Sequence, residues 1–98
     1  MIRSFKNQAT EDIFDGNNSK SARKLCRQEI WKVAARKLEQ IDSVGQIEDL
    51  KVPPGNRLES LSGDREGQHS IRINDQYRVC FEWNDGAADN VEVVDYHR

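Results

Sequence analysis

The second half of the chain alternates apolar and polar residues, and this pattern constrains the fold more than any other feature. Three runs with this pattern cover residues 68–73, 77–83 and 90–96, and a shorter run covers residues 57–61. Turn sequences rich in Asn, Asp and Gly separate the runs. Successive side chains of a strand point to opposite faces, so each run can bury one face. Because consecutive strands with short connections usually pair, the sequence predicts an antiparallel meander.

The first half of the chain has the spacing of helices. Apolar residues recur at helical intervals over residues 22–41, and Ser19 or Ser21 can cap the start of one long helix there. Residues 9–14 predict a shorter helix capped by Thr10. We therefore expect two main helices before the meander.

Three further segments complete the predicted order of elements. Residues 1–5 indicate a short strand, and residues 43–50 indicate another short helix capped by Ser43. Residues 51–57 contain two consecutive prolines and form a rigid turn that neither a helix nor a central strand could cross. The result is an α+β fold, summarised as β-α-α-β-β-β, with helices packed on one face of a small, largely antiparallel sheet.

Size and composition favour a small reduced protein. Its 98 residues suit a single domain over residues 1–98, and no apolar run approaches the length of about 20 residues that crosses a membrane. The start of the chain lacks the hydrophobic segment of a signal peptide. Cys26 and Cys80 lie far apart in apolar patterns, which indicates buried free thiols. We expect a cytoplasmic protein with no membrane association.

The charge is unevenly distributed. The formal net charge is −2, yet the segment from Lys20 to Lys37 carries seven cations and one anion. A basic face on an acidic protein can contact phosphates locally. This makes Lys20, Arg23, Lys24 and Arg27 candidate RNA-binding residues. A solvated helix face explains the same pattern.

The two strands that precede the last one predict a hairpin with a three-residue turn. If Ile73 pairs with Tyr77, the apolar residues of both strands lie on the same face. The same register places Arg72 directly opposite Arg78. A slip of one residue would remove this juxtaposition.

Two facing arginines need an explanation, because like charges normally destabilise a cross-strand pair. An anion between Arg72 and Arg78 supplies one, and the planar guanidinium fork suits phosphate. Alternatively, each arginine pairs with its own carboxylate, such as Glu82 or Glu92. Neither guanidinium is needed for the core, so we expect replacement of Arg78 to leave the fold intact.

The end of the chain concentrates polar chemistry. Alternation places Asp95 and His97 on one face of the last strand and Tyr96 on the other. Histidine titrates near neutral pH and can act as a general acid or base. A lone terminal histidine is more often simply solvated, but paired arginines and a carboxylate nearby make His97 a candidate catalytic residue. His69 follows the apolar alternation and is more typical of a core or supporting histidine.

No cofactor or metal site is expected. The two cysteines and two histidines lack the spacing of metal ligands. The glycines form neither a P-loop nor a dinucleotide-binding fingerprint.

Together these segments resemble a known family. The stretch "NRLESLSGDREGQHSIRINDQYRVCFEW", followed by "VEVVDYH" and preceded by the opening "MIRSF", is similar to the HigB-type toxins of the RelE superfamily. The specific features are Gly-Asp-Arg, Ser-Ile-Arg-Ile-Asn, Tyr-Arg and Asp-Tyr-His in this order. The resemblance covers nearly the whole chain.

The resemblance implies a fold, an activity and partners. It implies the small ribonuclease fold of RelE-like proteins and a toxin that cleaves messenger RNA within the translating ribosome. It also implies neutralisation by a HigA-type helix-turn-helix antitoxin, with operator DNA bound only through that antitoxin. Attack by the 2′-hydroxyl of RNA requires a proton acceptor, a proton donor and cations, but no metal.

The resemblance also assigns roles to residues. Arg72 and Arg78 match the family's arginines and would stabilise the transition state. His97 would act as acid or base, with Asp95 orienting it or sharing its task. Tyr96 would stack on a base or help to transfer protons. Arg65 in the Gly-Asp-Arg turn would contact substrate or ribosomal RNA.

One departure leaves the strength of the activity open. Some family members carry His and Lys where this chain has Glu59 and Ser62. The resemblance is therefore compatible with an active endoribonuclease or with a weakly active one. The alternative function is a catalytically weak protein that acts mainly as binding partner and co-repressor of its antitoxin.

Overall fold

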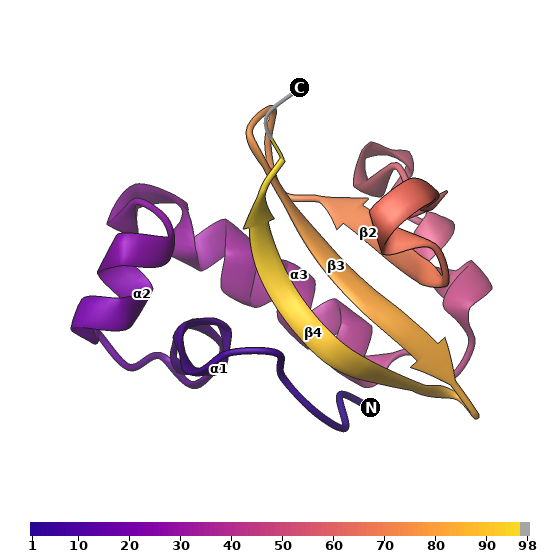
Figure 1. Ribbon diagram of the computed structural model, residues 1–98, viewed down its shortest axis with the longest axis horizontal. Coiled ribbons are helices and arrows are strands. Elements are labelled where there is room, and N and C mark those ends of the chain that lie inside the picture. Colours follow the sequence, from indigo (N-terminus) through magenta and orange to yellow (C-terminus); the bar gives the residue numbers. More distant parts are fainter. Residues whose placement is uncertain (97–98) are drawn as a thin grey trace.

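The chain folds into a four-stranded antiparallel sheet with its helices packed on one face, as a computed structural model shows (Figure 1). The structure describes residues 1–96. The strands follow the order β1-β2-β3-β4 and comprise β1 (Glu59–Ser60), β2 (Gln68–Arg72), β3 (Tyr77–Asn84) and β4 (Ala87–Asp95). The α-helices are α1 (Gln8–Asp15), α2 (Lys20–Leu25) and α3 (Trp31–Ser43). Short 3-10 helices are η1 (Gln28–Ile30), η2 (Ile47–Lys51), η3 (Pro54–Asn56) and η4 (Gly63–Arg65). The expected α+β class is confirmed.

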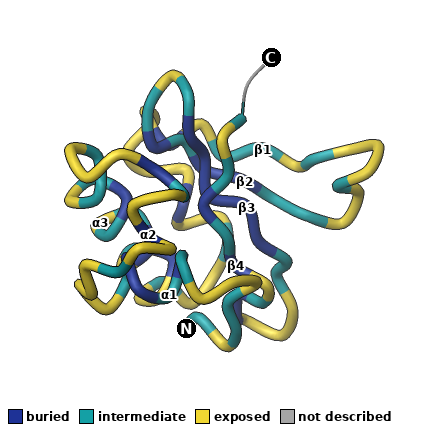
Figure 2. Tube along the Cα trace, turned by 60° about the vertical axis from the view of Figure 1, so that its left-hand side comes forward, coloured by how far each residue is buried: buried dark blue, intermediate teal, exposed yellow. Residues whose placement is uncertain are grey.

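The core lies between the sheet and the helices, where buried segments of both meet (Figure 2). Phe81 and Val93 on the strands and Leu38 and Ile41 on α3 are almost fully buried. Burying large apolar side chains supplies most of the favourable free energy of folding. The alternation in the sequence therefore determines which face of the sheet turns toward the helices.

The α1 helix begins one residue before the predicted range and has a different cap. Asn7 is the N-cap, and its Oδ1 accepts a hydrogen bond from the Thr10 backbone N at 2.9 Å. Thr10 is instead buried in the helix, where its hydroxyl accepts a hydrogen bond from the Val93 backbone N at 3.1 Å. The predicted Thr10 cap was wrong, because its hydroxyl joins α1 to β4.

The predicted long helix is broken after α2. Ser19 caps α2 as one of the two predicted candidates, accepting a hydrogen bond from the Ala22 backbone N at 3.1 Å. Cys26 then adopts an extended conformation with φ −156° and ψ 160°. The Trp31 indole N donates to the Cys26 carbonyl at 3.0 Å, where α3 begins. Ala22 and Cys26 are both buried, so the apolar residues continue across the break between the helices. The spacing of apolar residues in the sequence therefore cannot show where the helix breaks.

Residues 43–50 also differ from the prediction. Ser43 is the last residue of α3 and caps no following helix. The next element is η2, a 3-10 helix that starts only at Ile47. The helical run ends at the C-cap residue Val44, whose backbone is extended with φ −79° and ψ 145°.

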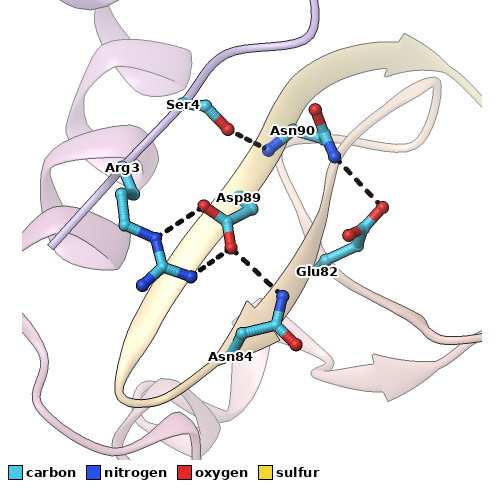
Figure 3. Close-up of polar contacts among 6 residues, drawn as sticks. All are labelled: Arg3, Ser4, Glu82, Asn84, Asp89 and Asn90. Carbon is cyan, nitrogen blue, oxygen red and sulfur yellow. Dashed lines mark hydrogen bonds and ion pairs between the residues drawn. The ribbon is translucent and has the colours of Figure 1, made fainter.

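The N-terminal segment runs beside β4 but forms only isolated bridges instead of the predicted strand. Ile2 bridges to Ala88 and Phe5 to Val91, both in parallel orientation. The Arg3 guanidinium donates to both carboxylate oxygens of Asp89, with 2.9 Å from Nε to Oδ1 (Figure 3). This pairing covers part of the outer edge of β4, which would otherwise present unpaired backbone groups.

The meander and its predicted register are confirmed. Ile71 pairs with Val79 and Arg72 with Arg78, and the Ile73 backbone N donates to the Tyr77 carbonyl at 2.9 Å. The expected three-residue turn therefore connects β2 to β3. Within the described part of the chain, no helix is both long and apolar enough to cross a membrane.

Candidate active site

Arg72 and Arg78 lie opposite each other at one end of the sheet and line a pocket of about 390 Å³. The pocket forms where β2 ends, β3 begins and β4 ends. It is lined by Arg57, Glu59, Arg72, Asn74, Asp75, Arg78 and Tyr96. Three arginines, two carboxylates, an amide and a phenol therefore surround a space large enough for a phosphate with its neighbouring sugar atoms.

Protein acceptors hold Arg78 firmly. Arg78 is only 8% exposed. Its Nε donates to the Ser70 hydroxyl at 2.8 Å, and its Nη2 donates to the Arg57 carbonyl at 2.6 Å. Its guanidinium lies 5.9 Å from the centre of the Tyr96 ring, within the range of a cation–π interaction. The nearest carboxylate oxygen belongs to Glu59, at 3.9 Å from Nη2. Arg78 therefore presents a positive charge in a fixed position.

Arg72 is held more loosely. Its side chain is 34% exposed, and its Nη2 forms an ion pair with Asp75 Oδ1 at 2.5 Å. The Asp75 side chain is fully exposed on the turn between β2 and β3. Each arginine has a carboxylate partner of its own, as the alternative interpretation expected, but the example partners Glu82 and Glu92 were wrong. The observed carboxylate partners are Asp75 and, at longer distance, Glu59.

Asn74 shapes the turn that carries Asp75. Its side-chain Oδ1 accepts hydrogen bonds from the backbone N of Gln76 at 2.9 Å and of Tyr77 at 2.8 Å. Asparagine commonly closes turns in this way. The position of Asp75 at the pocket rim therefore follows from a local sequence signal.

A buried amide network positions the Arg57 carbonyl that holds Arg78. Asn56 is fully buried, and its Nδ2 donates to the Gln40 side chain at 3.0 Å and to the Leu50 carbonyl at 3.1 Å. Its Oδ1 accepts a hydrogen bond from Lys37 Nζ at 2.5 Å. Arg57 follows in the left-handed region with φ 46°, a conformation that surrounding contacts must maintain in a residue other than glycine. The polar wall of the pocket is thus anchored to α3 and η2.

Lys37 adds positive charge near this wall. Burial lowers the pKa of Lys37, and the neighbouring charges of Arg36 and Arg72 lower it further. Sequence inspection places Lys37 only in the basic segment. Its proximity to Arg72 results from packing of α3 against the rest of the chain.

The structure separates the predicted catalytic residues. Tyr96 lines the pocket, and its backbone N donates to the Gln76 carbonyl at 2.7 Å. Asp95 pairs with Tyr77 across the strands, so it belongs to the opposite side of the sheet from Arg78. The described residues that line the pocket do not include Asp95, whose Oδ2 accepts a hydrogen bond from Gln76 Nε2 at 3.1 Å. His97 lies outside the described residues.

Arg65 takes part in a separate polar cluster. Its Nη1 donates to Glu92 Oε1 at 2.9 Å and to Gln68 Oε1 at 3.1 Å, and Lys6 Nζ lies 3.7 Å from the same Glu92 oxygen. The Glu92 hydrogen bond raises the pKa of Arg65. This cluster ties η4 to β4 on the face of the sheet that carries Arg78.

The four predicted RNA-binding cations Lys20, Arg23, Lys24 and Arg27 are exposed on and just after α2. None of these four cations is among the described residues that line the pocket. They form a surface separate from the arginine pocket, and Arg23 also hydrogen-bonds the Asn18 carbonyl at 3.1 Å.

Sequence inspection missed Arg57, Asn74 and Asp75 as pocket residues. The Asn-Asp-Gln turn next to an arginine was a usable signal for Asp75, because a three-residue turn brings its side chain back toward the strand end. No local signal in the sequence indicates that Arg57 lines the pocket, because the segment that carries it reaches the pocket only through tertiary packing. Among residues 1–96, no cluster of three or more His, Cys, Asp or Glu side chains could hold a metal ion.

Comparison with known proteins identifies the family. Residues 3–97 match the model of the HigB-like toxin family, described as the RelE-like toxin of type II toxin–antitoxin system HigB. The chain is 38% identical over 98 residues to toxin HigB-1 of Vibrio cholerae, covering 100% of this chain and 99% of that one. It is 30% identical over 97 residues to endoribonuclease HigB of Proteus vulgaris, covering 99% and 100%.

Solved structures support the fold independently. The chain superposes on a chain of a heterotetrameric YoeB–YefM toxin–antitoxin complex from Staphylococcus aureus with a TM-score of 0.60 and 22% identity, covering 100% of this chain and 99% of that chain. A second YoeB–YefM complex from the same organism gives a TM-score of 0.55 at 20% identity, with the same coverage. With both sequence and fold in agreement, the chain belongs to the HigB-like family of RelE-like toxins of type II toxin–antitoxin systems.

Proposed function

We propose that this protein is an endoribonuclease toxin that cleaves messenger RNA on the ribosome and so stops translation and growth. The observation that carries the proposal is the pair of facing arginines in a pocket that also contains a carboxylate and a tyrosine. Its relative in Proteus vulgaris bears the name endoribonuclease HigB, which supports the same chemistry.

In the proposed reaction the 2′-hydroxyl of the RNA attacks the adjacent phosphorus and the 5′-oxygen leaves. Negative charge increases on the phosphate oxygens in the transition state, where Arg78 and Arg72 would stabilise it. The nucleophile belongs to the substrate, so we propose a metal-independent mechanism. Removing one preorganised donor of this kind typically costs about 10²-fold in rate or more.

Two residues are proposed for proton transfer. Glu59 lines the pocket beside Arg78 and can accept the proton of the 2′-hydroxyl. His97 directly follows the pocket residue Tyr96 in the chain and is proposed as the donor to the leaving oxygen. Tyr96 can stack on an unpaired base, as aromatic side chains do in many RNA-binding proteins.

The proposed partners are an antitoxin, the ribosome and messenger RNA. Structural neighbours come from toxin–antitoxin complexes, which supports an antitoxin partner for this chain. We propose a HigA-type helix-turn-helix antitoxin, with operator DNA bound only through it. The exposed cations of α2 are proposed to contact ribosomal RNA, and the cytoplasm is the proposed location.

The test is inducible expression in cells, with growth arrest and the 5′ ends of cleaved transcripts as readouts. Arg72→Ala and His97→Gln should each abolish arrest and reduce cleavage by about 10²-fold or more. Lys51→Ala, which removes an exposed cation of η2, is the control and should behave like the parent. Circular dichroism and thermal unfolding of each purified variant show whether it is folded.

Two outcomes would contradict the proposal. A folded Arg72→Ala variant that arrests growth like the parent would show that the arginine pocket is not the catalytic site. A parent that binds its antitoxin but cleaves no transcript would favour the alternative function of a binding partner and co-repressor.

A further inference from the structure

The two arginines of the pocket differ in what holds them. Arg78 has neutral acceptors, the Ser70 hydroxyl and the Arg57 carbonyl, which stay in place when an anion enters. Among the described residues, the Arg72 guanidinium has a single hydrogen-bond acceptor, the Asp75 carboxylate. A carboxylate and a phosphate compete for the same guanidinium fork. Arg72 therefore carries a hydrogen-bonded anion that a substrate would have to displace, whereas the Glu59 carboxylate lies 3.9 Å from Arg78 Nη2 without a hydrogen bond to it.

Asp75 contributes nothing visible to the turn that carries it. The turn is closed by the Asn74 side chain and by backbone bonds from Ile73 and Asn74 to the Tyr77 carbonyl. The Asp75 side chain is fully exposed and forms an ion pair with Arg72. An acidic residue at the rim of a pocket for RNA repels the phosphates of the substrate through its charge.

We propose that Asp75 occupies the phosphate-binding position of Arg72 in the free pocket, so that an RNA phosphate binds by displacing it. This inference rests on the proposed function and adds a residue that lowers the affinity of the same site. Asp75 is a specificity-determining residue, and it is not a catalytic one. A neutral or weakly anionic ligand cannot displace it efficiently, whereas a phosphodiester aligned with both arginines can.

The expected size of the effect follows from the exposure of the pair. Exposed ion pairs are weak, so removing the competing carboxylate should tighten phosphate binding by about two- to fivefold. The gain should shrink as the salt concentration rises, because the competing pair and the RNA phosphate are both screened. Asp75→Asn keeps the size and the polarity of the side chain and removes only the charge.

The experiment titrates the free toxin with a single-stranded 2′-O-methyl RNA oligonucleotide, which cannot be cleaved because it has no free 2′-hydroxyl. NMR signals of the arginine side chains report whether the oligonucleotide reaches Arg72 and Arg78. The parent, Asp75→Asn, Arg72→Ala and the double variant are compared. Asp85→Asn is the matched control, because Asp85 is an exposed aspartate in the turn at the other end of β3.

The proposal expects Asp75→Asn to bind about two- to fivefold more tightly than the parent, and Asp85→Asn to bind like the parent. In the Arg72→Ala background, Asp75→Asn should have no effect. An equal gain with and without Arg72 would indicate general repulsion and would overturn the proposal, as would unchanged binding by Asp75→Asn. Binding that does not affect the signals of either arginine would overturn the proposed function as well.

Discussion

Arg78 combines a full charge with burial, and its partners explain how both are possible. Its guanidinium donates to Ser70 and to the carbonyl of Arg57, so little of its hydrogen-bonding capacity is lost on burial. A buried charge is tolerated only when such partners are present. The expectation that Arg78 could be replaced without consequence for the fold therefore differs from the structure, because this side chain joins β2, β3 and residue 57.

The first prediction compares the two arginines. Arg78→Ala should lower the free energy of unfolding by about 1–3 kcal/mol, because it leaves the Ser70 hydroxyl and the Arg57 carbonyl without their donor. Arg72→Ala removes only an exposed ion pair and should change the free energy of unfolding by about 0.5 kcal/mol or less. Urea denaturation of both variants measures the difference. Equal stabilities would show that the contacts of Arg78 do not contribute to folding.

At the scale of elements, the pocket depends on segments that are far from it in the sequence. The hairpin of β2 and β3 supplies Arg72 and Arg78 through its register. The wall opposite comes from η3 and residue 57, which Asn56 ties to α3 and η2. A single buried amide thus connects the helical layer to the pocket.

The second prediction concerns that amide. Asn56→Ala should lower the free energy of unfolding by about 1–3 kcal/mol, because Gln40, Leu50 and Lys37 lose a buried hydrogen-bond partner. Cleavage should also fall, because the Arg57 carbonyl is no longer held against Arg78. Gln28→Ala is the control, since the Gln28 side chain is exposed and its removal should cost about 0.5 kcal/mol or less. If Asn56→Ala unfolds like that control, the network does not stabilise the fold.

At the scale of the whole molecule, the N-terminal segment lies beside the first half of β4. The backbone of residues 1–6 forms hydrogen bonds with the backbone of Ala88 and Val91 in β4. One of them runs from the Arg3 N to the Ala88 carbonyl at 2.7 Å. The Arg3–Asp89 pair fastens the same segment through side chains. The hydrogen bonds from Arg3 and Asn84, together with the charge of Arg3, lower the pKa of Asp89 to about 2.

The third prediction follows from this pKa. Because the pKa of Asp89 lies below its ordinary value of 3.8, the pair stabilises the fold above about pH 4 and loses this contribution as the pH falls toward 2. Asp89→Asn should therefore be less stable than the parent at pH 6, and the difference should narrow between pH 4 and pH 2. Thermal unfolding as a function of pH measures it, with Asp49→Asn in η2 as an exposed control. A difference that stays constant over this range would show that Asp89 does not act through its charge.

The sequence by itself determined the class of fold, the meander and the register that opposes Arg72 to Arg78. These features depend on alternation and turn residues, which act between neighbours in the chain. Only the tertiary structure decided that the long apolar stripe breaks at Cys26, because a broken and an unbroken helix can bury the same residues. It also decided that Arg57, Asn56 and Lys37 support the pocket and that Asp95 belongs to the other side of the sheet. Such contacts join residues up to tens of positions apart, and packing of one element on another sets them, so no local pattern in the sequence records them.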